Sequence, residues 1–351
     1  MSFYEEPNIS EENPKETVYH FGNGFYNPYV EPAWKKEGRL IRNTANGIGL
    51  AALGYVVISL LSGKFYDFLM GVLFPSANIH GMLYVTEAAE WIFDIATYVI
   101  SIVVPFGIYM LCMRMPLSVA LPFKKPKTDM AIGGILISLG MSVLASYAVS
   151  FIQIALGEVG IGITMNEYET PETVPGLVLY VIFLAIIPAF FEEIAFRGIL
   201  MQSLRRFGDG FALVVSALAF GIFHFNLIQM PYSFIMALCM GYFVMRTGSL
   251  WVTIIIHFIN NGVAVVFEFL YPHLTEKAAY LTDAIYALIS VALSVIGIVF
   301  LLSRYKDMFR FEPGKTVLSP EKRTIYFITA PVLIAAMIVS VMLTLPNIYI
   351  I

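Results

Sequence analysis

Runs of about 20 mainly apolar residues recur along this chain and constrain its fold more than any other feature. About 20 helical residues, at about 1.5 Å each, are needed to cross the hydrocarbon core of a bilayer. Such runs predict about nine transmembrane helices (eight to nine), and therefore an all-α fold, a polytopic transmembrane helical bundle. The predicted ranges are 43–63, 91–113, 130–156, 174–204, 210–228, 231–247, 249–271, 280–302 and 324–346.

The overall composition fits lipid as the main solvent. Hydrophobic residues make up 58% of the 351 residues, charged residues make up 13%, and the mean hydropathy is +0.77. Soluble domains carry about 25% charged residues. We therefore predict an integral membrane protein whose helices contact membrane lipid. The net charge of −4 is spread over short segments and forms no basic face, so no nucleic-acid partner is expected.

Lys and Arg residues gather in alternate loops, which predicts the orientation. Loops rich in Lys and Arg are retained in the cytoplasm. Most basic residues fall on the cytoplasmic side when the N-terminus is placed there, whereas the loop 157–173 carries glutamates and no basic residue. We predict a cytoplasmic N-terminus with an acidic, proline-containing, flexible tail at 1–42. The tail has no apolar signal-peptide core, so the first helix is expected to insert without cleavage.

Ionisable and amide side chains interrupt three of the predicted helices. Each ionisable group costs about 2.5–3.5 kcal/mol at the centre of a membrane helix, so it calls for a partner or a function. The fourth helix holds two Glu and an Arg, the fifth holds a His, and the seventh holds a His and two Asn. These residues are Glu192, Glu193, Arg197, His224, His257, Asn260 and Asn261.

Helical spacing predicts how some of these side chains face. Residues four apart lie on the same face of a helix. Glu193 can therefore pair with Arg197, and His257 shares a face with Asn261. Glu192 then points toward a different helix as a free carboxylate.

Depth allows three of the polar positions to meet. Counted from the predicted helix ends, Glu192, His224 and His257 lie about 18, 21 and 12 Å deep. A carboxylate, two imidazoles and the amide of Asn261 suffice to hydrolyse an amide bond, because they supply a base for water and donors for the oxyanion. A Glu with two His also resembles a hydrolytic metal site. The alternative is that each residue only joins helices through hydrogen bonds.

Three motifs at these positions resemble those of the CPBP family of intramembrane proteases. That family includes CAAX-processing prenyl endopeptidases and bacterial proteins linked to bacteriocin processing and self-immunity. Its motifs EExxxR, FxxxH and HxxxN occur here in order, within 175–270. The motif residues in this chain are Glu192, Glu193, Arg197, Phe220, His224, His257 and Asn261.

The resemblance implies a role for each of the polar motif residues. Glu192 would activate the water together with His224. His257 and Asn261 would stabilise the oxyanion or help to hold a metal.

The resemblance leaves the cofactor open, because the family is described both as metalloproteases and as metal-independent glutamate proteases. Zn²⁺ bound by Glu192, His224 and His257 is one expectation, and a metal-free glutamate protease is the other. Glu193 and Arg197 are expected to shape the site in either case.

The predicted organisation has four parts: the tail 1–42, N-terminal transmembrane helices at 43–173, a catalytic core of four helices at 174–271, and C-terminal helices at 272–351. The expected function is that of an intramembrane endopeptidase of the bacterial plasma membrane that cleaves a membrane-associated protein or peptide. One alternative is a non-catalytic membrane immunity or binding protein with the same fold. Another is a transporter that relays protons or metal ions through buried Glu and His, although no repeat between halves supports it.

Overall fold

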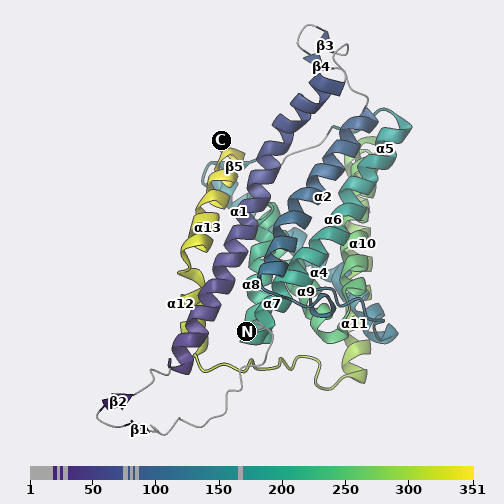
Figure 1. The fold of residues 1–351 in the computed structure, drawn as a ribbon. Helices are drawn as coiled ribbons and strands as arrows, with labels where there is room; N and C mark the ends of the chain where they lie inside the picture. The colour runs from purple at the N-terminus through teal and green to yellow at the C-terminus, as the bar shows by residue number, and fades with distance from the viewer. Residues whose placement is uncertain are drawn as a thin grey trace.

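Long helices run side by side and form a bundle, with short strand pairs at its edges (Figure 1). The all-α polytopic prediction is confirmed. Most of the tail predicted at 1–42 lies outside the described residues, but helix α1 already begins at Ala33. The computed structural model describes residues 19–21, 24–26, 31–73, 78–79, 82–83, 87–164 and 169–351.

The helices follow the predicted apolar runs in order. The fourth run, residues 174–207, is one long helix, here called the site helix, in which η2 and η3 are π-helical. Its parts are α5 (Val174–Val181), η2 (Ile182–Ile186), α6 (Ile187–Glu192), η3 (Glu193–Leu200), α7 (Met201–Leu204) and η4 (Arg205–Phe207). The other helices are α1 (Ala33–Leu73), α2 (Glu87–Cys112), α3 (Leu117–Ala120), α4 (Thr128–Glu158), α8 (Asp209–Ile222), α9 (Gln229–Thr247), α10 (Leu250–Leu270), η5 (Tyr271–His273), α11 (Glu276–Arg304), α12 (Pro320–Ile328), α13 (Pro331–Thr344) and η6 (Leu345–Asn347).

The strands are short and pair two by two. Each pair is antiparallel: β1 with β2, β3 with β4, and β5 with β6. The third pair joins the segment after α4 to the C-terminal residues. The strands are β1 (Tyr19–Phe21), β2 (Gly24–Tyr26), β3 (Asn78–Ile79), β4 (Met82–Leu83), β5 (Ile161–Ile163) and β6 (Ile348–Ile350).

Local sequence fixes several helix ends. Thr173, Ser249 and Thr275 each accept a hydrogen bond from a first-turn backbone N–H of the helix that follows. Such caps satisfy amides that no carbonyl of the helix can reach. Helix α9 ends at Gly248, whose φ of 64° is in the left-handed region that glycine adopts at little cost. This tight turn leads directly into α10, which carries His257.

Six helices in the described ranges are long and apolar enough to cross a membrane, or up to seven if the bent pair of α12 and α13 counts as one span. Two of the nine predicted spans do not meet this criterion. The prediction at 210–228 corresponds to α8, which has only 14 residues, and the prediction at 231–247 corresponds to α9. At about 1.5 Å per residue, α8 covers about 21 Å, less than the hydrocarbon core of about 30 Å.

The prediction at 210–228 was too long because the apolar sequence continues past the end of the helix. Residues 223–228 form the turn between α8 and α9, and the two helices pack against each other. If α8 and α9 do not cross the membrane, two consecutive crossings are lost from the prediction. Every later helix then still crosses in the predicted direction.

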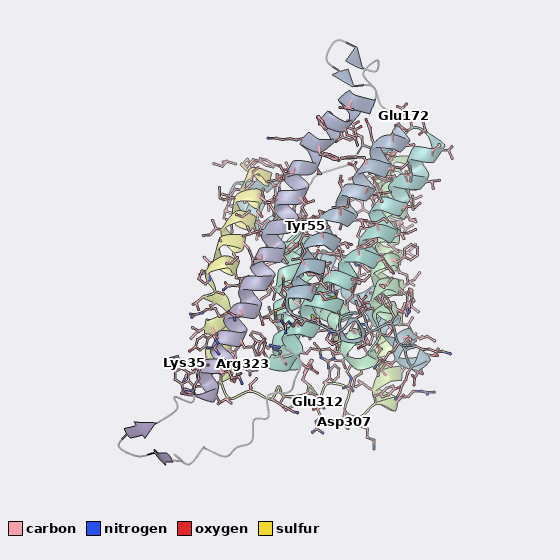
Figure 2. All side chains as sticks on the ribbon, in the orientation of Figure 1. Lys35, Tyr55, Glu172, Asp307, Glu312 and Arg323 are labelled. Carbon is pink, nitrogen blue, oxygen red and sulfur yellow. The ribbon has the colours of Figure 1, made fainter. Side chains whose placement is uncertain are left out.

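Charged side chains mark the two ends of the bundle (Figure 2). Lys35, Asp307, Glu312 and Arg323 lie at the end where α1 begins, and Glu172 lies at the opposite end. This separation agrees with an apolar middle inside a bilayer. The cytoplasmic placement of the Lys35 end stays a prediction.

The site helix lies inside the bundle, and α2, α8 and α10 pack against it. Helix α4 packs on α9 and α11, whereas α1 packs on α2, α12 and α13. One close approach depends on Gly198, because a Cβ there would lie 2.4 Å from the carbonyl oxygen of Ala120. The neighbours of the site helix are therefore the helices that carry the other motif residues, together with α2.

Candidate active site

A proline interrupts the backbone of the site helix one turn before the glutamates. Pro188 has no N–H to donate to the carbonyl four residues earlier, that of Leu184. The side chain of Asn261 on α10 donates to this carbonyl instead, with Nδ2 3.0 Å from the Leu184 oxygen. Leu184 lies in the π-helical segment η2, a geometry that occurs often at functional sites.

The second glutamate of the motif forms a fully buried ion pair. Arg197 Nη1 lies 2.9 Å from Glu193 Oε1, as the spacing of four residues predicted. Glu193 is 0% exposed and Arg197 is 1% exposed. The guanidinium carbon of Arg197 lies 4.0 Å from the ring centroid of Phe220, a favourable cation–π arrangement. Two opposite charges are thus paired inside the bundle.

His257 links this ion pair to the first glutamate. Its Nδ1 lies 3.0 Å from Glu193 Oε1. A carboxylate oxygen only accepts hydrogen bonds, so Nδ1 carries the hydrogen. The other ring nitrogen, Nε2, lies 3.8 Å from Glu192 Oε2. That separation is too long for a direct hydrogen bond, but both atoms can bond to one small molecule between them.

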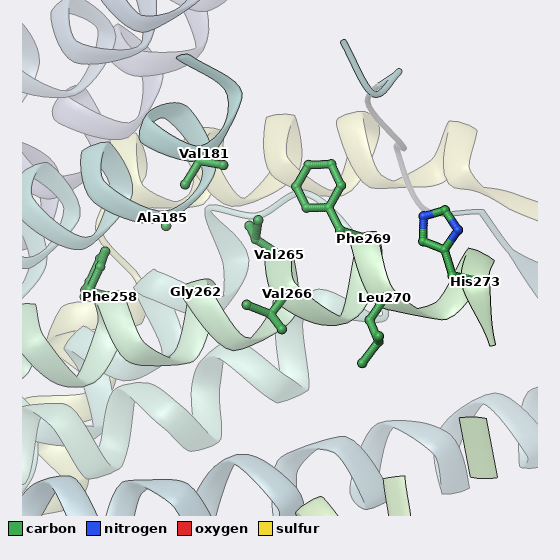
Figure 3. A pocket seen from close by; sticks show the side chains of 9 residues that line it. All are labelled: Val181, Ala185, Phe258, Gly262, Val265, Val266, Phe269, Leu270 and His273. Atoms are coloured by element: carbon green, nitrogen blue, oxygen red, sulfur yellow. The ribbon is translucent and has the colours of Figure 1, made fainter. Parts of the chain in front are cut away.

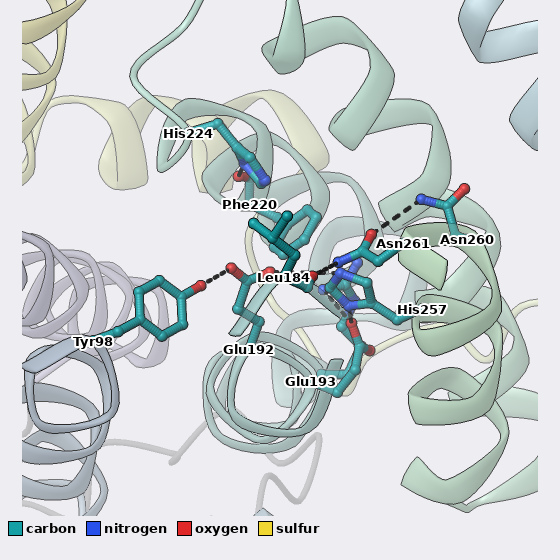
Figure 4. A network of polar contacts seen from close by, with 10 residues as sticks. Tyr98, Leu184, Glu192, Glu193, Phe220, His224, His257, Asn260 and Asn261 are labelled. Carbon is teal, nitrogen blue, oxygen red and sulfur yellow. Dashed lines mark hydrogen bonds and ion pairs between the residues drawn. The ribbon is translucent and has the colours of Figure 1, made fainter. Parts of the chain in front are cut away.

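Glu192 is held from the other side by Tyr98. The Tyr98 hydroxyl, on α2, donates a hydrogen bond to Glu192 Oε1. Glu192 Oε2 is buried and accepts no hydrogen bond. The carboxylate therefore lies between Tyr98 and His257 (Figure 4). Tyr98 was missed by the sequence interpretation, because no motif marks it and helical spacing does not tell which helix lies opposite.

His224 sits just beyond the end of α8, in the turn that leads to α9. Its Nδ1 lies 2.8 Å from the carbonyl oxygen of Phe220, to which it donates, so Nε2 is an acceptor in the neutral ring. The Phe220 ring contacts both imidazoles edge to face, at 4.9 Å from His224 and 6.0 Å from His257. Figure 4 shows Phe220 beside both histidines.

Asn261 ends a chain of hydrogen bonds. The Ser142 and Tyr232 hydroxyls are 2.8 Å apart, and Tyr232 donates to Asn260 Oδ1 at 2.6 Å. Asn260 Nδ2 in turn donates to Asn261 Oδ1 at 3.3 Å. The Asn261 oxygen is therefore engaged, and one of its two amide hydrogens bonds to Leu184. One amide hydrogen is left for another acceptor.

The three predicted metal ligands do not form a ligand set in this structure. Glu192 and His257 approach to 3.8 Å, whereas His224 forms no ion pair within 4.0 Å with either. Among the described residues, no three His, Cys, Asp or Glu side chains are arranged to hold a metal ion. Zn²⁺ at Glu192, His224 and His257 stays a prediction.

An apolar groove of about 590 Å³ lies at the seam between the site helix and α10 (Figure 3). Val181 and Ala185 line one side, and residues of α10 and η5 from Phe258 to His273 line the other. The groove is distinct from the polar cluster, because its lining is almost entirely aliphatic and aromatic.

Residues 174–263 match the model of a protein family described as type II CAAX prenyl endopeptidase Rce1-like. A curated relative, the membrane-embedded CAAX protease MroQ of Staphylococcus aureus (strain USA300), is 30% identical over 115 residues. That similarity covers 31% of this chain and 47% of MroQ, so the chain spans about half the length of this relative. No solved structure matches.

The matched segment contains the site helix, α8, α9 and most of α10, and thus all three motifs. Tyr98 and the strands β5 and β6 lie outside it. Through residues 174–263, this chain is therefore similar to the Rce1-like CAAX prenyl endopeptidases, which supports the resemblance of its motifs to those of the CPBP membrane proteases.

Proposed function

We propose that this chain is an intramembrane endopeptidase that hydrolyses a peptide bond of a membrane-associated protein or peptide. The family and the relative MroQ support membrane proteolysis in general. The residues that perform the reaction and the identity of the substrate are the proposed part.

One observation carries the proposal. Glu192 Oε2 is buried, accepts no hydrogen bond, and lies 3.8 Å from Nε2 of His257. A buried polar atom without a hydrogen bond costs free energy. Glu193 Oε2 is in the same state, but Glu193 is neutralised by Arg197, whereas the open oxygen of Glu192 faces an imidazole nitrogen. A carboxylate with one anchored oxygen and one open oxygen beside an imidazole is suited to take a proton from water.

The proposed reaction begins with a water molecule between Glu192 and the scissile carbonyl. Glu192 Oε2 takes a proton from the water while the water oxygen attacks the carbonyl carbon, whose oxygen becomes an oxyanion. The C–N bond then breaks, and the proton held by Glu192 passes to the leaving nitrogen. The carboxylate of Glu192 is thereby regenerated.

The imidazoles and the amide have separate proposed tasks. His257 already donates from Nδ1 to Glu193; with a second proton on Nε2 it donates to the oxyanion. Asn261 contributes its remaining amide hydrogen to the same oxyanion. His224 offers the acceptor Nε2 to the attacking water and helps to orient it.

The test compares the proteins of membranes that contain wild-type chain with those that contain Glu192→Ala. A fragment made only with the wild type, at equal amounts of both proteins in the membrane, is the expected result. If the same fragments occur with both, the non-catalytic binding protein becomes the better account. Chelation of purified wild type then separates the two enzyme classes, because only a zinc enzyme would lose cleavage and regain it with zinc.

A further inference from the structure

The turn that carries His224 is held by parts of the chain that lie far away in sequence. Helix α8 ends at Ile222 and α9 begins at Gln229, so the intervening backbone lies within the bundle without regular structure. Irregular backbone at membrane depth must find partners in the protein or in a water-filled cavity. We define the terminal clasp as Ile161–Thr164 together with Asn347–Ile351. Two polar groups of the turn form hydrogen bonds with this clasp.

The terminal clasp is a two-stranded antiparallel sheet with additional bonds at both ends. Strand β5 pairs with β6, with Gly162 opposite Tyr349. The Thr164 N–H donates to the Asn347 carbonyl at 2.9 Å, and the Ile351 N–H donates to the Gly160 carbonyl at 2.9 Å. The two segments are thus joined over their whole length before they reach the turn.

Each strand of the clasp binds one residue of the turn. Asn347 Nδ2 donates to the Phe225 carbonyl at 3.1 Å. Asn226 Nδ2 donates to the Thr164 carbonyl at 2.9 Å. The Asn226 oxygen accepts from the N–H groups of Ile228 and Gln229, at 2.9 and 3.2 Å, where α9 begins. Asn226 is itself buried, at 3% exposure.

The residue after His224 has a backbone conformation that needs such support. Phe225 has a φ of 48°, in the left-handed region that bulky residues rarely adopt. Strained backbone of this kind persists only where the surroundings enforce it. The Asn347 bond fixes the Phe225 carbonyl, and without it the Phe225 backbone can relax. Relaxation would rotate the peptide that joins Phe225 to His224 and would move the His224 ring.

We propose that the terminal clasp, acting through Asn347, positions His224 for the reaction. Asn347 is a positioning residue, because it contacts the Phe225 carbonyl and none of the reacting groups. The catalytic meaning of this inference rests on the proposed function, whereas the placement of His224 does not. Both strands of the clasp lie outside the family segment 174–263. The support of His224 therefore comes from residues that the family match does not include.

The first test observes His224 directly and needs no activity. The chain contains five His, so protein labelled with ¹⁵N-histidine in detergent micelles gives few side-chain signals, and His224→Gln identifies the signal of interest. Asn347→Ala should shift the His224 nitrogen resonances and leave those of His257 in place. The matched control is Ile350→Ala, in the same C-terminal segment of the clasp, because Ile350 is 90% exposed. This substitution should shift the resonances of neither histidine. Unchanged His224 resonances in Asn347→Ala would overturn the proposal.

The second test measures cleavage of the protein found by the membrane comparison. Asn347→Ala should lower kcat about fivefold, the equivalent of one hydrogen bond, while KM and the thermal unfolding midpoint stay near those of Ile350→Ala. A fall of the midpoint together with equal changes in kcat and KM would reduce the clasp to a structural role. If Asn347→Ala does not fold, Asn347→Ser serves instead, because its hydroxyl is too short to reach the Phe225 carbonyl.

The two tests distinguish the failure of the inference from the failure of the proposed function. If the wild type cleaves nothing but Asn347→Ala moves the His224 resonances, the clasp stands and the protease assignment falls. If the wild type cleaves and Asn347→Ala changes neither the resonances nor kcat, the assignment stands and the clasp inference falls.

Discussion

Two tyrosine–glutamate pairs connect the site helix to its neighbours, and they differ in what surrounds the carboxylate. In the inner pair, Tyr98 donates to Glu192; in the outer pair, Tyr180 donates to Glu268. Tyr180 is packed edge to face against Trp91 in an aromatic cluster, and Glu268, near the end of α10, is exposed. Among the described residues, no ion pair reaches Glu268.

The inner pair has a second set of partners that the outer pair lacks. The free oxygen of Glu192 is buried beside His257, and His257 is tied through Glu193 to Arg197. A carboxylate in an apolar helix is therefore not by itself evidence of a reaction centre. The neighbouring imidazole and the oxygen without a hydrogen bond distinguish the inner pair.

The largest contrast is expected between Glu192→Gln and Glu268→Gln. The first substitution keeps the shape and can still accept from Tyr98, but it cannot take a proton from water, so turnover should fall about 10²- to 10⁴-fold. The second should leave turnover within about twofold, because an amide oxygen can still accept from Tyr180. Cleavage rates at equal membrane content measure both. Equal losses in the two variants would erase the distinction between the pairs.

The next effect concerns the contribution of the ion pair between Glu193 and Arg197 to the stability of the fold. Arg197→Met leaves Glu193 buried without its cation and should lower the free energy of unfolding by about 3–5 kcal/mol. Glu193→Gln combined with Arg197→Met should cost less than the sum of the single changes, because the double variant buries no unpaired charge. The free energies of unfolding of the wild type, Glu193→Gln, Arg197→Met and the double variant, measured in one detergent, complete the double-mutant cycle. Strict additivity would show that the two side chains act independently.

A smaller difference is expected between Tyr98→Phe and Tyr180→Phe. Loss of the Tyr98 hydroxyl frees Glu192 to rotate away from His257, and kcat should fall about tenfold, as for a lost hydrogen bond to a charged group. Tyr180→Phe should change kcat less than about twofold, because Glu268 touches no group of the inner site. Steady-state rates and unfolding midpoints of both variants check this. A larger loss of kcat in Tyr180→Phe would assign the outer pair to the reaction.

The smallest expected effect is that of Asn260→Ala. It removes the donor to the Asn261 oxygen and leaves the bond from Asn261 to Leu184, so kcat should fall only about threefold, within the range of one neutral hydrogen bond. Tyr232→Phe, which removes the donor to Asn260, is the matched variant and should cost less. An effect of Asn260→Ala as large as that of Asn261→Ala would mean that the chain acts as one unit.

Much of the fold could be predicted from sequence because bilayer thickness fixes how long an apolar helix must be. The same apolarity hid the end of α8, because four of the six residues at 223–228 are apolar and no Gly or Pro lies among them. Hydropathy reports burial in lipid or protein alike. It cannot separate a short helix and a buried turn from one continuous span.

Within the candidate site, the sequence could predict only the contacts between residues of one helix. The spacing of Glu193 and Arg197 gave their ion pair, because both lie on one helix. The contacts of His257 with Glu193 and of Tyr98 with Glu192 join different helices. Periodicity tells which face a residue occupies and not which helix lies opposite, so neither contact could be derived from this one sequence.

Pro188 has a consequence for how the protein assembles. Synthesis proceeds from the N-terminus, so the site helix enters the membrane before α10 exists. In that interval the Leu184 carbonyl has no donor from Pro188 and no donor from Asn261, and an unsatisfied backbone group in lipid costs several kcal/mol. The residue that completes it is made 77 positions later. The backbone one turn before Glu192 is therefore finished only when α10 docks, which couples completion of this part of the site to the docking of a later helix.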